Sequence, residues 1–261
     1  MPLQVIQLLV LTTTVNILTI NRKSGASRFS IKYVTMIKFR HPNSRGHIKA
    51  DWIETYRTFS NNSYYDPNYV HYSDLEVIND DTVQPGHCVP VHQHCDMEIL
   101  GYVIQGPCYH NDNLRNVLHV QSNCVQRMTS GTGIWHTEGN LSDHPIRYLQ
   151  IWLRPNRHNT PPDYDWHEFT VEEKLNNFCP IASDKGPIII QSDAKVSAGV
   201  FTKDYRYVLN TTRRYYVYVV TGSATINGIV ADQGAGFSFE EESEIVITNP
   251  DNSEILLFNL R

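Results

Sequence analysis

The sequence lacks the features that identify disulfide-rich, membrane-spanning or nucleic-acid-binding proteins. Its five cysteines are an odd number without a C-x-x-C pair, so we expect no disulfide scaffold and no zinc–thiolate site. No apolar run is long enough for a membrane-spanning helix, so no membrane contact is expected. Lys and Arg number 22 against 27 Asp and Glu, which argues against direct nucleic-acid binding. These observations predict an intracellular, cytoplasmic protein, with the nucleus as an alternative in a eukaryotic cell.

Sustained helical periodicity is also scarce, and residues 171–175 form one short helical candidate. From Met36 onward, short runs rich in Val, Ile, Tyr and Thr alternate with Gly, Pro, Asn and Asp. Short strands at regular spacing predict an all-β fold, as a sandwich, jelly roll or barrel. A chain of 261 residues with 41% hydrophobic residues has room for one large or two small domains with a real core.

A weak internal repeat favours two copies of one β-domain. Residues 102–106 (Tyr-Val-Ile-Gln-Gly) resemble residues 218–222 (Tyr-Val-Val-Thr-Gly), and in both we expect an apolar strand to end at a glycine turn. Asn227-Gly228 lies between two short apolar runs, which predicts a type I′ hairpin turn. A polar, proline-containing connection then separates the halves. The expected units are a first domain over residues 36–155, a linker over 156–180 and a second domain over 181–261.

The first 35 residues differ from the rest of the chain. Residues 5–11 are apolar, but no Lys or Arg precedes Arg22, and three threonines follow, which argues against a secretory signal. We expect residues 1–35 to be a poorly ordered extension with at most one edge strand. Met36 is an alternative start of translation.

The strongest chemical feature is a pair of short motifs, His92-x-His94 and His136-x-Glu138, in a sequence with 12 histidines. In a strand, residues i and i+2 point to the same face with Cα atoms about 6–7 Å apart. Two such strands side by side would bring three imidazoles and one carboxylate together. Those ligands suit Fe(II), Mn(II), Ni(II), Cu(II) or Zn(II) rather than Ca or Mg. One H-x-H motif usually marks two half-exposed histidines, so the prediction depends on both motifs occurring together.

The spacing of residues around these motifs resembles the two sequence motifs of cupin proteins. The shared positions are Gly86, His92, His94, Glu98 and Gly106 in the first motif and Gly133, His136 and Asn140 in the second. The longer runs 92–100 and 131–138 are similar to the pirin family of two-cupin proteins. The similarity extends over about residues 36–261 and leaves residues 1–35 uncovered.

The pirin resemblance implies two tandem jelly-roll β-barrels with few short helices and one metal, usually iron, in the first barrel. It implies that the metal ligands are His92, His94, His136 and Glu138. In many cupins the glutamate of the first motif, here Glu98, is a ligand, whereas in pirins the later glutamate takes that position. Strand geometry agrees, because four residues separate Glu98 from His94 by about 13 Å. The second barrel has no histidine between residues 215 and 261, so we expect it to hold no metal.

The same resemblance implies a metal-dependent dioxygenase of the quercetin 2,3-dioxygenase (quercetinase) type. Such an oxidoreductase acts on a small aromatic, flavonol-like substrate with O2, and Glu138 could also be its catalytic base. The expected ion is Fe(II), with Mn, Ni, Cu or Zn as alternatives. A different possibility is an iron-binding redox sensor that modulates a protein partner in transcription, as eukaryotic pirin does. A purely structural β-protein is disfavoured, because buried imidazoles and a buried carboxylate are costly without partners.

Overall fold

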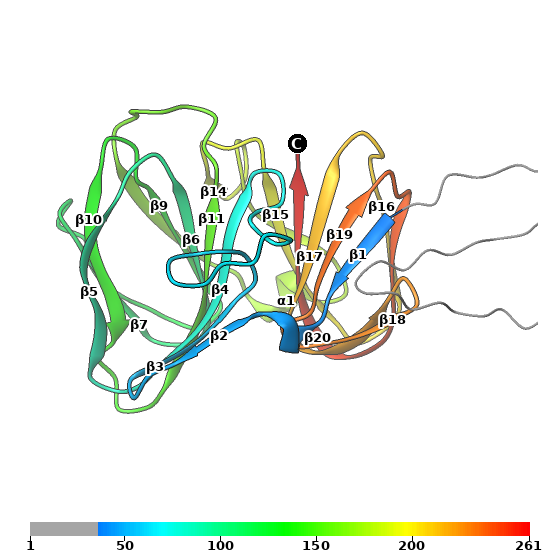
Figure 1. Cartoon of the computed structure of the whole chain (residues 1–261), viewed down its shortest axis with the longest axis horizontal. Coiled ribbons are helices and arrows are strands. Elements are labelled where there is room, and N and C mark those ends of the chain that lie inside the picture. The colour runs from blue at the N-terminus through cyan, green and yellow to red at the C-terminus, as the bar shows by residue number, and fades with distance from the viewer. Residues whose placement is uncertain (1–35) are drawn as a thin grey trace, which may run out of the picture.

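The computed structural model describes residues 36–261, so the extension expected over residues 1–35 lies outside the described residues. Figure 1 shows two lobes of β-sheet side by side, with the C-terminus between them. The short helical elements are η1 (Pro42–Ser44) and α1 (Val171–Lys174), and α1 is the helix expected at residues 171–175. This architecture confirms the predicted all-β fold with two cupin domains. In the described part of the chain, no helix has the length and apolar character needed to cross a membrane.

The first lobe contains a seven-stranded and a four-stranded sheet, and neighbouring strands in both are antiparallel. The seven-stranded sheet has the order β12 (Asp163–Glu168), β9 (Cys124–Thr129), β6 (Glu98–Gln105), β11 (Ile146–Leu153), β4 (Leu75–Val83), β3 (Ile53–Arg57) and β2 (Gly46–Lys49). The four-stranded sheet has the order β5 (His87–His94), β10 (Ile134–Asn140), β7 (Cys108–Asp112) and β8 (Val117–Val120).

The second lobe is one nine-stranded sheet. Its main path runs β1 (Met36–Arg40), β19 (Gly236–Glu240), β17 (Arg214–Ile226), β20 (Glu244–Leu260), β15 (Lys195–Phe201), β13 (Cys179–Ser183) and β14 (Ile188–Ile189). Off this path, β16 (Tyr205–Val208) pairs with β20, and β18 (Ile229–Asp232) pairs with β17.

Two strands pair outside the unit to which their residue range assigns them. The domain limits of 36–155, 156–180 and 181–261 stay a prediction. Strand β1 falls in the range of the first domain, but it pairs with β19 of the second lobe. Strand β12 falls in the range of the linker, but it pairs with β9 of the first lobe. In both places an additional strand covers an edge that would otherwise expose unpaired backbone groups. Figure 1 shows the chain passing from β1 through η1 into β2 of the other lobe.

A hydrophobic cluster joins the two lobes. Leu100 of β6 and Leu149 of β11 pack in it together with Tyr218 of β17 and Leu256 of β20, and all four are fully buried. Burial of each large apolar side chain contributes about 1.5–3 kcal/mol, so this cluster binds the lobes firmly. Because side chains alternate along a strand, the opposite faces of β6 and β11 point into the first lobe, where the two histidine motifs lie.

The predicted turns are confirmed in part. Strand β17 ends at Ile226 and β18 begins at Ile229, and the intervening Asn227 and Gly228 have φ values of 46° and 83°, as a type I′ turn requires. The expected strand end at Gly222 is wrong. Strand β17 continues through Gly222, whose φ of 71° is accommodated where the register against β20 shifts.

Candidate metal centre

Strands β5 and β10 are antiparallel neighbours, and they carry the two histidine motifs. Their register places His136 opposite His92 and Ile134 opposite His94. The ring centroid of His136 lies 4.4 Å from that of His92 and 5.1 Å from that of His94. The centroids of the His92 and His94 rings are 4.7 Å apart. One ring nitrogen from each of the three lies within 4.8 Å of the others. The structure therefore brings three of the four predicted ligands together.

The protonation of these imidazoles suits a cation. His92 Nδ1 lies 2.9 Å from the Pro90 carbonyl, which only accepts hydrogen bonds, so Nδ1 is the donor in this contact and Nε2 is the ring nitrogen that remains for another partner. Burial, with the neighbouring His92, lowers the pKa of His94 to about 4 and that of His136 to about 2. Both rings are therefore neutral near pH 7.

Several of these ring nitrogens are buried and form no hydrogen bond within the described residues. His94 Nε2 and both ring nitrogens of His136 have no hydrogen-bond partner among residues 36–261. Buried polar atoms are normally paired, and an unpaired lone pair on neutral imidazole is the donor that divalent transition metals prefer. The three side chains thus fit such an ion.

Glu138 is buried on β10, two residues after His136, and lies outside the group of three. The β5–β10 register shifts between His136 and Glu138, so Glu138 lies opposite Val89. Its Oε1 accepts a hydrogen bond from the side-chain amide of Gln150 on β11. Burial, and then the charge of Asp81, raise the pKa of Glu138 to about 8. A cation at the three histidines would favour the ionised form instead.

Gln150 and Trp152, both on β11, complete the surroundings of Glu138. Trp152 donates from Nε1 to Gln150 Oε1 at 3.1 Å, and its ring lies edge-on to His94 at 4.9 Å. Indole nitrogen is only a donor, so Gln150 must turn its carbonyl toward Trp152 and its amide hydrogens toward Glu138. Sequence reasoning missed both residues, since they come from a different sheet and carry no local signal.

A further histidine, His110 of β7, lies at the edge of the centre. Its ring centroid is 5.6 Å from that of His136, and it stacks on Tyr164 at 4.4 Å. His110 Nε2 lies 3.0 Å from a carboxylate oxygen of Asp112, and burial lowers the pKa of His110. The sequence did contain a signal for this residue, because His110-x-Asp112 has the same period-two spacing as the two metal motifs.

Glu98 points to the other face of its sheet. It shares that face with Leu100 and Tyr102, which pack in the cluster between the lobes. Thr129 donates to Glu98 Oε2 at 2.9 Å, and burial raises the pKa of Glu98 to about 7. This geometry favours Glu138 over Glu98 as the fourth ligand, and the ligand set remains a prediction.

Comparisons with known proteins agree with the fold and the histidine cluster. The family model for pirin matches residues 38–153, and the model for the quercetinase C-terminal cupin domain matches residues 180–260. A quercetin 2,3-dioxygenase of Escherichia coli K12 is 38% identical over 229 residues, which cover 86% of this chain and 99% of that protein.

Solved structures give the same result. The crystal structure of YhhW from E. coli superposes with a TM-score of 0.82 at 34% identity, covering 87% of this chain and 98% of that one. The complex of the bacterial pirin YhhW with nickel(II) gives a TM-score of 0.81 at 34% identity, over 86% and 99% of the two chains. These relatives support an oxidoreductase of the cupin dioxygenase class. With both cupin domains matched over most of its length, the chain belongs to the pirin family.

Proposed function

We propose that this protein is a metal-dependent dioxygenase that acts on flavonol-like substrates with O2. The observation that carries the proposal is the convergence of three imidazole nitrogens within 4.8 Å, on strands of which β10 also carries the buried Glu138. His92, His94, His136 and Glu138 would together hold one divalent ion. The names of the relatives support the reaction class, and a nickel complex of one pirin supports a divalent metal.

The identity of the ion is part of the proposal. Fe(II) follows from the pirin resemblance, whereas the nickel complex of YhhW favours Ni(II) as the first alternative. Mn, Cu and Zn also accept imidazole and carboxylate ligands. When bound, the ion supplies a Lewis acid that increases the acidity of a coordinated phenolic hydroxyl.

The side chains around the ion have separate tasks. Glu138 can take the hydroxyl proton in its ionised form, which a cation at the three histidines would favour over the protonated form that burial favours. Gln150 occupies Oε1 of Glu138, so Oε2 is the oxygen left to face the ion or the proton. Burial of His136 and Glu138 keeps water away from this end of the centre.

The test is oxygen-dependent loss of quercetin by protein whose metal content is measured by elemental analysis. We expect turnover in air but not under argon, and we expect His136→Ala to lose both metal and turnover. His119→Ala is the matched control, because His119 is exposed on β8 and forms no part of the cluster. Absence of turnover with all five candidate metals would contradict the enzyme. Metal binding without turnover would instead support the redox-sensing alternative.

A further inference from the structure

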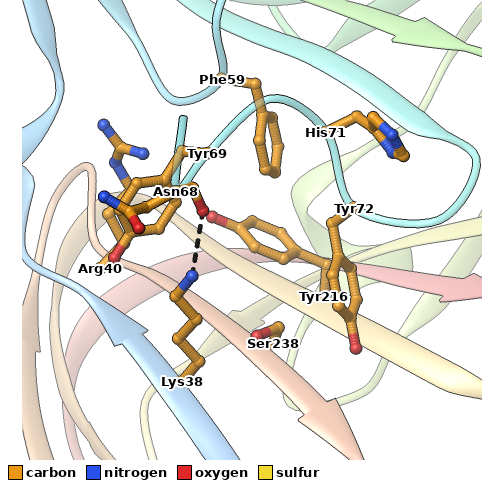
Figure 2. Close-up of a pocket in the computed structure, with 9 residues that line it drawn as sticks. All are labelled: Lys38, Arg40, Phe59, Asn68, Tyr69, His71, Tyr72, Tyr216 and Ser238. Atoms are coloured by element: carbon orange, nitrogen blue, oxygen red, sulfur yellow. Dashed lines mark hydrogen bonds between the residues drawn. The ribbon is translucent and has the colours of Figure 1, made fainter. Parts of the chain in front are cut away.

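A small pocket lies apart from the metal centre, where the β3–β4 connection meets the second lobe. Figure 2 shows Lys38 and Arg40 of β1 beside Tyr216 of β17 and Ser238 of β19, with residues of the β3–β4 connection above them. None of the three clustered histidines lines this pocket. Nothing in the proposed dioxygenase chemistry uses its side chains.

Two cations in this pocket contact one aromatic ring. Lys38 Nζ lies 4.3 Å and Arg40 Cζ 3.6 Å from the centroid of the Tyr69 ring. Arg40 Nη2 forms an ion pair with a carboxylate oxygen of Asp66 at the long distance of 4.0 Å. Among residues 36–261, no carboxylate forms an ion pair with Lys38, whose Nζ donates to the Asn68 carbonyl at 3.0 Å. The pocket therefore has an excess of positive charge.

Arg40 also has donors that no group within residues 36–261 accepts. The residue is only 1% exposed, and Nη2 donates to the Ser44 carbonyl at 2.9 Å and to the Tyr64 hydroxyl at 2.8 Å. Its Nε and Nη1 are buried without a hydrogen-bond partner in the described part of the chain. A guanidinium cannot lose its proton in a protein, so these donors call for an acceptor.

A buried hydroxyl adds to this set. The Tyr216 hydroxyl is buried and has no hydrogen-bond partner within residues 36–261. Ser238, which is 8% exposed, supplies a second hydroxyl to the pocket lining. Hydroxyl groups and cationic N–H groups together are the donors that surround bound carboxylate and phosphate groups in proteins.

We propose that this pocket binds a small oxyanion, presented as a carboxylate or a phosphate group. The oxygens of the anion would accept from Arg40, Lys38 and Tyr216, and its charge would balance the excess cation. The ligand must be small, because Phe59 and Tyr72 wall the pocket with aromatic rings. The site is independent of the metal and of the dioxygenase reaction.

Calorimetric titration of the full chain with inorganic phosphate and with acetate, against chloride at equal ionic strength, tests this. We expect saturable binding of at least one oxyanion but not of chloride, and the two titrations distinguish phosphate from carboxylate. Lys38→Met removes one cation and Tyr216→Phe one hydroxyl while each keeps its packing, so each should weaken binding about tenfold. Lys185→Met, at an exposed turn, makes the same charge change elsewhere and should leave binding unaltered.

The variant His136→Ala separates this site from the metal centre. Oxyanion binding should persist in it, because the pocket shares no residue with the histidine cluster. Three outcomes would overturn the proposal. They are the lack of saturable oxyanion binding in the wild-type protein, unchanged binding in both Lys38→Met and Tyr216→Phe, and loss of binding in His136→Ala.

Discussion

Gln150 donates a hydrogen bond to Glu138 and thereby ties the buried acid of the centre to the strand on the opposite sheet. Trp152 fixes the direction of that bond, because its indole N–H occupies the carbonyl oxygen of Gln150. Trp152 also packs edge-on against His94. One chain of contacts thus sets the position of the carboxylate and supports one imidazole.

The first prediction tests this chain of contacts. Trp152→Phe keeps an aromatic ring against His94 but removes the N–H that orients Gln150. We expect the affinity for Ni(II) to fall about tenfold, in the range found when supporting hydrogen bonds to metal ligands are removed. Competition with a chromophoric chelator measures the affinity. Trp166→Phe, at a half-exposed position on β12, is the control, and equal affinity in both variants would disprove the positioning role.

The second prediction decides between the two candidate carboxylates. Glu138→Gln should strongly reduce the metal content, because the proposed fourth ligand is then an amide, which is a poorer ligand than a carboxylate. Glu98→Gln should leave the metal content nearly unchanged, because Glu98 faces the cluster between the lobes. Elemental analysis of both variants measures this. Loss of metal from Glu98→Gln alone would show that the other carboxylate is the ligand.

The third prediction concerns pH and Asp81, which is buried in the first lobe. Burial raises the pKa of Asp81 from its ordinary 3.8 to about 6. The folded protein therefore binds this proton more tightly than the unfolded chain does. The stability linked to the proton is fully present below pH 3.8 and is lost as the pH rises through 6.

Asp81→Asn removes this titration while keeping a similar shape. We expect the variant to become more stable relative to wild type as the pH rises from 4 to 7.5, with the difference in unfolding free energy growing by about 2.4 kcal/mol. Urea unfolding of chelator-treated protein at the two pH values measures it. A difference that does not change with pH would contradict the raised pKa.

The convergence of the histidines could be predicted from sequence because it needs only local rules. The i and i+2 spacing places His92 and His94 on one face, and a neighbouring strand adds His136. Those rules depend on strand periodicity, which the alternating sequence signals well. The resemblance to pirins added the choice of Glu138.

The support for that carboxylate could not be predicted in the same way. Gln150 reaches Glu138 from β11, and no local pattern indicates a hydrogen bond between strands of different sheets. The same limit applies to β1, whose pairing with β19 joins segments about two hundred residues apart. The register shift between His136 and Glu138 likewise depends on an extra residue in β5, which the β10 sequence alone does not specify.

The last prediction concerns the junction of the two lobes at Asp80. Arg147 donates to both carboxylate oxygens of Asp80, at 2.8 and 2.9 Å, and the Tyr218 hydroxyl of the other lobe donates at 3.2 Å. Asp80→Asn leaves the largely buried Arg147 without its counter-charge, so we expect a loss of about 3–5 kcal/mol in unfolding free energy.

The control is the exposed ion pair of Arg206 with Glu244. Glu244→Gln should cost at most about 1 kcal/mol, because exposed pairs are well solvated and screened. Urea unfolding of both variants near pH 7 measures the two losses. Equal losses of unfolding free energy would show that Asp80 does not hold the lobes together. A loss confined to Asp80→Asn would show that the buried network stabilises the contact between the lobes.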